Sequence, residues 1–378
     1  MPEATFEEKL AEYWLKRDPF GPDYEVPMAG RKAEWREIQE RVEQALYRHG
    51  NDIIVILGDY GMGKTYTLWQ MHEHYKNVHE LWVTKPVPLL SSEGTSRFAA
   101  DLIGRTLRQG IGYGQAIDLI RQADDSWQES VDNPAVLDLL RNLASEKPTT
   151  RDKAIDRLTR NRDNLIAQEI LFALQFVLAA AGRRAFLWLV DEFEYIMILS
   201  STKVSQLVNT LRDIYDHQPE VELRYGPERS AKIILILASS PAGWELLQKL
   251  TRDVVRKTGG AGVVPFRQRI PSTNIITLAP LNRDGCHDLI AWRLAKNRTG
   301  DIPGEPLIPY DEGFVDLVLE VAQGVPRRIL AYATVVLLGA LEQGLPRITV
   351  DAARSILEKE GFLNSLGVGS LPTKTMTE

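Results

Sequence analysis

Short runs of apolar, mostly β-branched or aliphatic residues recur along the first three quarters of the chain. Uninterrupted runs lie at 53–57, 185–190 and 233–238. Such runs are typical of strands that are buried on both faces of a sheet. Weaker runs predict shorter strands at 81–85, ended by Pro86 and Pro88, and at 275–278. Helix-like stretches separate the runs, so the pattern predicts an α/β fold with a parallel sheet between two layers of helices.

The pattern changes after Pro280, where apolar residues recur only at helical spacing. One apolar stripe lies at positions 286, 289, 290 and 294, and the next lies at positions 314, 317, 318 and 321. Pro326 suits the first position of a further helix, and Thr349 suits the cap of a fourth. We therefore expect a small α-helical lid domain over 281–362, followed by a flexible tail at 363–378.

Two other segments differ from the strand–helix alternation. Residues 1–27 contain prolines at 19, 22 and 27, which predict an extended N-terminal arm. The core would then occupy 28–280. Within it, 95–181 is predicted to be mostly helical, with breaks at 110–114 and near Pro148. This helical insert is long for a connection between two strands.

Composition narrows the class of protein. The 378 residues include 45 basic and 51 acidic side chains, a net charge of −6, so contact with nucleic acid would need a local basic patch. The single cysteine, Cys286, excludes an internal disulfide framework and a multi-cysteine metal site. The N-terminal residues do not form a signal peptide, and the longest apolar run, 171–181, is too short to span a bilayer. We predict a cytoplasmic protein without a membrane partner.

A glycine-rich segment carries the clearest chemistry. The run at 53–57 leads directly into GDYGMGKT at 58–65, and a helix-forming stretch follows. This order is typical of the phosphate-binding loop of an NTPase, in which backbone N–H groups and a helix N-terminus surround phosphate oxygens. Lys64 would bind the β- and γ-phosphates, and the Thr65 hydroxyl would bind Mg²⁺. The expected nucleotide-binding residues are Gly58, Asp59, Tyr60, Gly61, Met62, Gly63, Lys64, Thr65 and Tyr66.

An acidic pair follows the second uninterrupted run. Asp191 and Glu192 come directly after the strand predicted at 185–190. Ligands of open α/β sheets gather outside the carboxyl ends of the strands, so the pair is expected near the phosphate loop. Asp191 would then support the Mg²⁺ ion, and Glu192 would activate the attacking water. Together with the loop, the pair predicts a Mg²⁺-dependent ATPase.

These features resemble AAA+ ATPases, and most of all the branch of origin-recognition and replication-initiator ATPases, with the archaeal-type and STAND ATPases nearby. The segment MAGRKAEW at 28–35 is similar to the family's box along the nucleotide base, which implies that Arg31 binds nucleotide. Gly-Val-Pro-Arg at 324–327 resembles the second sensor in the lid, which implies that Arg327 reaches the γ-phosphate. Ser239 and Ser240 stand where the family has its first sensor; Asn is common there, and the choice between the serines stays open.

The resemblance also implies assembly. Many AAA+ members hydrolyse ATP between subunits, because a neighbour supplies an arginine to the γ-phosphate. The family carries that arginine just before the last core strand, where Arg267 is our candidate and Arg269 is the other choice. The implied function is an ATP-controlled homo-oligomer that acts on DNA or on a DNA-bound partner complex.

Both the source of DNA contact and the class of function have alternatives. The chain shows no evident winged-helix domain after the lid, so DNA contact would come from core loops, such as the basic stretch at 249–269, or from a partner. An ATP-gated switch of the defence or signalling type, which docks proteins and binds little DNA, is the main rival. A small-molecule kinase is a third reading, disfavoured because the acidic pair positions a hydrolytic water.

Overall fold

The computed structural model describes residues 6–21, 28–89, 97–257, 266–300 and 306–363. Contacts divide the chain into two compact units. The sheet unit comprises Glu34–Tyr60 and Lys64–Leu278, and the helical unit comprises Met1–Ala33, Gly61–Gly63 and Ala279–Glu378. The predicted domain bounds stay a prediction, because a compact unit need not fold by itself.

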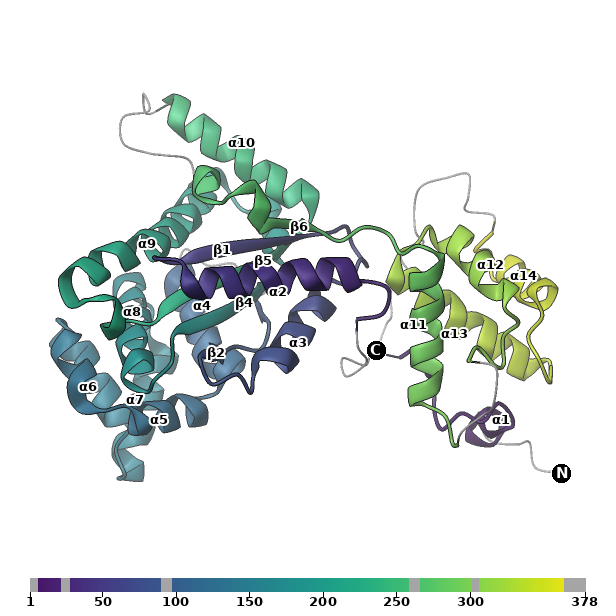
Figure 1. The fold of residues 1–378 in the computed structure, drawn as a ribbon, viewed down its shortest axis with the longest axis horizontal. Coiled ribbons are helices and arrows are strands. Elements are labelled where there is room, and N and C mark those ends of the chain that lie inside the picture. The colour runs from purple at the N-terminus through teal and green to yellow at the C-terminus, as the bar shows by residue number, and fades with distance from the viewer. Residues whose placement is uncertain (1–5, 22–27, 90–96, 258–265, 301–305, 364–378) are drawn as a thin grey trace. The chain divides into compact units, whose positions relative to one another are not determined.

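A parallel sheet forms the centre of the sheet unit (Figure 1). Its strands are β1 (Asp52–Leu57), β2 (Leu81–Val83), β3 (Val87–Pro88), β4 (Ala185–Asp191), β5 (Lys232–Ser239) and β6 (Ile275–Thr277). Their order is β2-β4-β5-β1-β6, and β3 also pairs with β4. Every residue of β1, β4 and β5 is buried, as their uninterrupted apolar runs predict. The predicted α/β class is confirmed.

The register brings the ends of three strands to one edge of the sheet. Leu57 pairs with Ser239, the last residue of β5, and Val190 pairs with Leu237. Since all the paired strands are parallel, the segments that follow β1, β4 and β5 leave the sheet at this carboxyl edge. The chain passes from β1 toward β2 on one side and from β5 to β6 on the other, so the direction of the connections reverses at β1 and β5, as at the binding crevice of other open α/β sheets.

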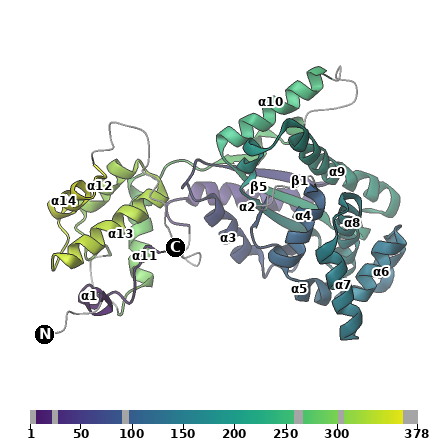
Figure 2. The same ribbon diagram turned by 180° about the vertical axis from the view of Figure 1, so that it is seen from behind.

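Helices cover both faces of the sheet (Figures 1 and 2). Helices α2 (Lys32–Tyr47) and α3 (Lys64–Tyr75) lie over one face, where the rings of Trp35 and His74 meet. Helices α4 (Phe98–Arg105), α8 (Asn164–Ala180) and α9 (Ser201–Tyr225) lie over the other. The unit also contains α10 (Pro241–Lys257) and the short elements η3 (Phe193–Ile198), η4 (Pro227–Arg229), η5 (Phe266–Arg269) and η6 (Ser272–Asn274).

The insert between β3 and β4 is helical, as its pattern predicted. It contains α4, η1 (Thr106–Ile111), α5 (Tyr113–Gln122), η2 (Asp125–Ser130), α6 (Pro134–Leu143), α7 (Pro148–Arg160) and α8. The predicted breaks have local causes. Gly112, with φ of 87°, separates η1 from α5, and Pro148 opens α7 at the start of a helix, where its missing N–H costs little.

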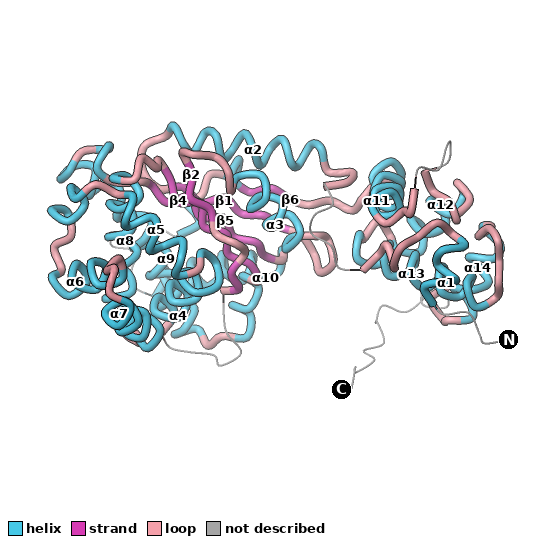
Figure 3. Tube along the Cα trace, turned by 90° about the horizontal axis from the view of Figure 1, so that it is seen from below, coloured by secondary structure: helices cyan, strands magenta, loops and turns pink. Residues whose placement is uncertain are grey.

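The helical unit has its own apolar core. After β6 the chain forms α11 (Arg283–Lys296), α12 (Gly313–Ala322), α13 (Pro326–Glu342) and α14 (Val350–Lys359). Pro326 opens α13, and the Thr349 hydroxyl accepts a hydrogen bond from the Ala352 N–H, as predicted. Figure 3 shows helices and loops but no strand in the described part of this unit.

Two expectations about secondary structure are wrong. The N-terminal segment is not extended throughout, because Phe6–Glu12 forms α1. Leu10, Tyr13 and Leu15 are buried in the core of the helical unit, and the Tyr13 hydroxyl donates to the Leu345 carbonyl. The apolar residues of the N-terminal segment thus pack into a core formed by residues far along the sequence. The strand predicted at 81–85 ends at Val83, and a second short strand follows at Val87–Pro88. Pro88 lies at the sheet margin, where the missing N–H of a proline is tolerated.

Among the described residues, no helix is both long and apolar enough to cross a membrane.

Candidate functional site

The phosphate-binding segment starts at the carboxyl end of β1. The Gly58 N–H donates to the Ser239 carbonyl at 3.2 Å, which continues the pairing of β1 with β5. Lys64 is the first residue of α3, and its side chain is buried at 8% exposure. Its Nζ donates to the Gly58 carbonyl at 2.9 Å. The ammonium group therefore returns to the start of its own loop.

Thr65 and Asp191 come together at the same edge. Asp191 ends β4 and is 6% exposed. Its carboxylate is hydrogen-bonded to the Thr65 side chain, and it accepts a bond from the Glu192 N–H at 2.8 Å. Burial raises the pKa of Asp191 above its ordinary value, and these two hydrogen bonds oppose the rise. A hydroxyl and a carboxylate in contact are the hard oxygen donors that Mg²⁺ prefers.

Glu192 has an unusual backbone. Its φ of 58° and ψ of 35° lie in the left-handed region, which costs a residue other than glycine about 1 kcal/mol or more. This conformation turns the chain from β4 into η3 and leaves the Glu192 side chain half-buried. Burial raises its pKa, and the negative charges of Asp191 and Glu194 raise it further. The strained backbone therefore belongs to the residue whose carboxylate is predicted to activate water.

Glu194 belongs to this cluster, although the sequence interpretation missed it. Its Oε1 lies 3.3 Å from Lys64 Nζ, in an ion pair whose side chains are 8% and 30% exposed. Its Oε2 is buried and has no hydrogen-bond partner in the part of the chain that the structure describes. An acidic residue three positions after Asp191 was the available signal, since a tight turn after β4 returns that position toward the strand end.

The two candidate sensor serines make different local contacts. Ser239 is fully buried, and its hydroxyl donates to the Ser240 carbonyl at 3.1 Å. The Ser240 hydroxyl accepts a hydrogen bond from the Gly243 N–H at 3.1 Å, which caps the first turn of α10. The choice between the two serines stays open, because each hydroxyl already has a partner near the carboxyl edge.

The middle of the phosphate loop makes its contacts within the helical unit. Gly61 and Gly63 have φ of 86° and 92°, a conformation that L side chains rarely adopt. The Arg327 N–H donates to the Gly61 carbonyl at 3.2 Å, and the buried Arg31 donates from Nη2 to the Met62 carbonyl at 3.0 Å. Arg31 and Arg327 are thus both bonded to loop carbonyls, and the side chain of Arg327 is exposed.

The remaining predicted residues differ in burial. Asp59 and Tyr60 are exposed, and Tyr66 is half-buried on α3. The side chain of Arg267 lies outside the described residues, as does the glycine-rich part of the basic stretch at 258–262. Arg269 bonds to Asp216 through Nε at 2.9 Å and Nη2 at 2.8 Å. This pair leaves Arg269 a less suitable choice than Arg267 for an arginine that serves a neighbour.

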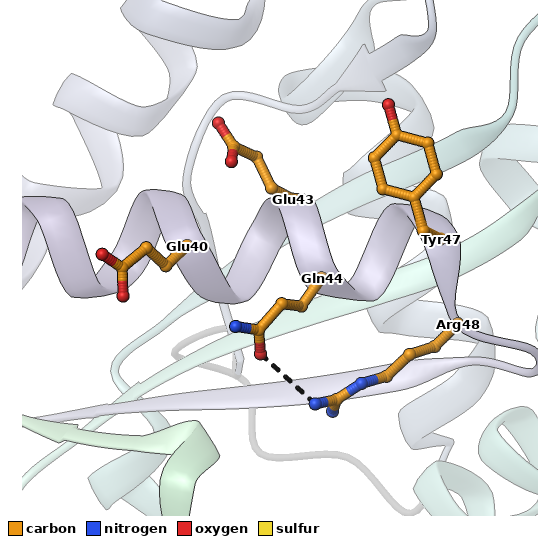
Figure 4. A pocket seen from close by; sticks show the side chains of 5 residues that line it. All are labelled: Glu40, Glu43, Gln44, Tyr47 and Arg48. Carbon is orange, nitrogen blue, oxygen red and sulfur yellow. Dashed lines mark hydrogen bonds between the residues drawn. The ribbon is translucent and has the colours of Figure 1, made fainter.

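A separate cavity of about 420 Å³ lies on the last two turns of α2, lined by Glu40, Glu43, Gln44, Tyr47 and Arg48 (Figure 4). Arg48 donates to the Gln44 side chain across it. Because α2 ends just before β1 begins, this cavity lies at the amino edge of the sheet. It is therefore not part of the site at the carboxyl edge.

No protein-family model matches the sequence. No curated protein sequence matches it. Solved structures do match: Cdc6p from Pyrobaculum aerophilum has a TM-score of 0.52 at 15% identity, over 91% of this chain and 71% of that one. The ORC2 protein of Aeropyrum pernix, in its ADPNP-ADP complexes, has a TM-score of 0.54 at 16% identity, over 91% and 72%.

The chain has the fold of these two proteins. The fold implied by the phosphate loop, the acidic strand end and the helical C-terminal region is therefore confirmed. At such low identity the likeness establishes the fold, and the chemistry must come from this chain's own residues.

Those residues fit a magnesium nucleotide. The two loop glycines hold conformations in which a side chain would be strained, and open space surrounds the Cβ position of Gly63. Lys64 supplies a cation, while Thr65 and Asp191 supply oxygen donors within one hydrogen bond of each other. Among the described residues no group of three histidine, cysteine or acidic side chains could hold a metal ion alone. A metal here would thus share its coordination with phosphate and water, as Mg²⁺ commonly does.

Proposed function

We propose that the chain is a Mg²⁺-dependent AAA+ ATPase of the cytoplasm. The observation that carries the proposal is the grouping of Lys64, Thr65 and Asp191 where β1 and β4 end. A phosphate loop alone binds phosphate. The same loop beside a hydroxyl–carboxylate pair and a strained glutamate has the parts for hydrolysis.

Each residue has a distinct role in this proposal. Lys64 and the loop N–H groups bind the phosphates, and Thr65 and Asp191 hold Mg²⁺, which neutralises charge on the phosphates when bound. Glu192 accepts a proton from the attacking water. Its raised pKa brings it closer to neutral pH, where a general base is more effective. A bound cation would offset part of this rise.

The sensor and base-binding roles are also proposals. Arg327 reads the γ-phosphate, Ser239 or Ser240 polarises the water or the γ-phosphate, and Arg31 supports the nucleotide through the loop. The hydrogen bonds from Arg31 and Arg327 to the loop carbonyls support these roles, since they couple both segments to the loop. ATP is the proposed nucleotide, because the ORC2 protein of the same fold was solved with ADPNP and ADP.

The working form would be an ATP-controlled homo-oligomer that acts on DNA or on a DNA-bound partner complex. Arg267 supplies the arginine in trans, and Arg269 is the weaker choice because of its pair with Asp216. The resemblance of the phosphate loop and of Gly-Val-Pro-Arg at 324–327 to initiator ATPases supports the DNA role. An ATP-gated protein-docking switch with little DNA binding uses the same site and differs only in its partner.

ATP turnover measured against protein concentration, with and without duplex DNA, tests the proposal. Turnover per chain should rise with concentration, because a neighbour completes the site, and should rise again with DNA. Arg267→Ala should lose the concentration dependence, whereas the matched variant Arg229→Ala, on η4 at the amino edge, should keep it. Tight ATP binding with turnover that neither DNA nor concentration changes would favour the docking switch. Absence of ATP binding would refute the ATPase.

A further inference from the structure

Lys64 is paired with Glu194, a residue that has no role in the proposed hydrolysis. Lys64 Nζ has two partners, the Gly58 carbonyl at 2.9 Å and Glu194 Oε1 at 3.3 Å. An ammonium group can donate three hydrogen bonds, so these partners occupy most of its capacity. A phosphate that accepts only the third N–H therefore shares the ammonium with both partners, whereas a phosphate that needs two N–H groups must displace one of them.

Of the two, Glu194 is the partner that a phosphate would displace. The Gly58 carbonyl is a neutral backbone group fixed beside β1, whereas Glu194 carries a negative charge. Phosphate and carboxylate at one ammonium repel each other, and Asp191 and Glu192 already place negative charge nearby. The loss of Lys64 as a partner would leave Glu194 a half-buried carboxylate among like charges.

The position of Glu194 is set by a close backbone approach. A Cβ on Gly243 would lie 2.9 Å from Glu194 Cα and 3.1 Å from Ser239 Oγ. Only glycine at position 243 lets η3 sit this close to the first turn of α10. The backbone of Glu194 is therefore positioned by packing between η3 and α10, and its carboxylate lies within ion-pair distance of Lys64.

We propose that Glu194 is an internal competitor for the phosphate-binding lysine, so that nucleotide binds most tightly when its carboxylate has left Lys64. This inference rests on the proposed function and names a regulation of the same site. The apparent affinity for nucleotide is the intrinsic affinity multiplied by the fraction of chains in which Lys64 is not paired with Glu194. Any contact that draws Glu194 away, such as a shift of η3 against α10, raises that affinity.

Fluorescent ADP binding to Glu194→Gln and wild type tests the proposal, with inorganic pyrophosphate as a competing probe. The variant keeps the side-chain shape and removes the charge, so ADP and pyrophosphate should both bind about tenfold more tightly. Glu194→Asp, which keeps the charge on a shorter side chain, should fall between the two. Glu228→Gln removes an exposed charge at the amino edge and should match wild type.

The outcomes separate the two proposals. If wild type binds ADP and Lys64→Met does not, the phosphate site stands. Unchanged or weaker binding by Glu194→Gln then overturns the competitor role alone. Tighter ADP binding without tighter pyrophosphate binding also overturns it, because the gain would not come from the phosphates. If wild type binds neither probe, the proposed function fails first. Thermal unfolding of each variant without nucleotide checks that all are folded.

Discussion

The carboxyl edge of the sheet and the insert helices α6 and α7 belong to the same unit, yet their charged residues lie in different environments. At the edge, Lys64 and Asp191 are 8% and 6% exposed, and Glu192 has a strained backbone. In α6 and α7 every buried residue is apolar. The ion pairs of these helices, such as Arg160 with Asp156, have side chains that are more than half exposed.

This difference indicates where stability and function reside. Buried charges are costly and persist only with partners, so a chain that keeps two of them together beside half-buried glutamates is expected to use them chemically. Exposed pairs contribute little to stability, and the insert is stabilised mainly by its apolar contacts. Substitutions at the edge should therefore alter chemistry with small effects on folding. Substitutions in the core of the insert should do the reverse.

The largest expected effect is on turnover. Glu192→Gln should lower ATP turnover by about 10²–10⁴-fold, because the amide cannot accept the proton from water. Binding of ADP should remain within a few-fold of wild type, since Lys64 and Thr65 are unchanged. Steady-state hydrolysis and fluorescent ADP binding measure the two quantities. The matched variant Glu146→Gln, an exposed acid of the insert, should leave both unchanged, and equal turnover by both variants would contradict the role of Glu192.

The insert should show the opposite response. Leu140 on α6 is 1% exposed, so Leu140→Ala should lower the free energy of unfolding by about 2–5 kcal/mol. Leu165, at 63% exposure on α8, provides the control: Leu165→Ala should change it by about 0.5 kcal/mol or less. Urea unfolding gives the stability, and ADP affinity below the unfolding range should stay the same in both. A large loss of affinity in folded Leu140→Ala would show that the insert and the site are coupled.

The smallest expected effect concerns His217, where α9 meets the insert helix α8. Its ring stacks on Phe172 with 3.5 Å between centroids, and burial lowers its pKa from 6.5 to about 4. Because the folded chain resists protonation, the stability that the neutral ring contributes is complete above pH 6.5 and is lost as the pH falls toward 4. Between pH 7 and pH 4.5 the free energy of unfolding of His217→Phe should therefore fall by about 1–2 kcal/mol less than that of wild type, after allowance for partial exposure. Urea unfolding in which acid lowers the free energy of unfolding equally in wild type and His217→Phe would contradict this assignment.

The sequence predicted those parts of the fold that depend on short-range pattern. The apolar runs of β1, β4 and β5 and the helix beginning at Lys64 follow from neighbouring residues alone. The fold shared with Cdc6p and the ORC2 protein was also within reach, because the phosphate loop and the acidic pair each follow directly on an apolar run. The sequence-derived site roles stay predictions, although Lys64, Thr65 and Asp191 do meet at one edge of the sheet.

Features that depend on distant contacts were out of reach. The burial of Leu10 and Tyr13 depends on a core made by residues some 300 positions later, so prolines alone suggested an extended arm. The pair of Arg269 with Asp216 joins two elements 53 residues apart. The spacing of Glu194 from Asp191 did indicate a place near the strand end, but its pairing with Lys64, on another strand connection, forms only in the folded sheet.

The proposed function depends most on the binding of a magnesium nucleotide at the carboxyl edge through Lys64. Calorimetric titration of ATP into wild type, Lys64→Met and Lys249→Met, each with and without Mg²⁺, tests it most directly. Lys249 is an exposed residue of α10 and controls for the loss of charge. We predict Mg²⁺-dependent binding by wild type and by Lys249→Met, and a loss of about 100-fold in affinity by Lys64→Met. Equal binding by all three proteins, or binding indifferent to Mg²⁺, would contradict the account.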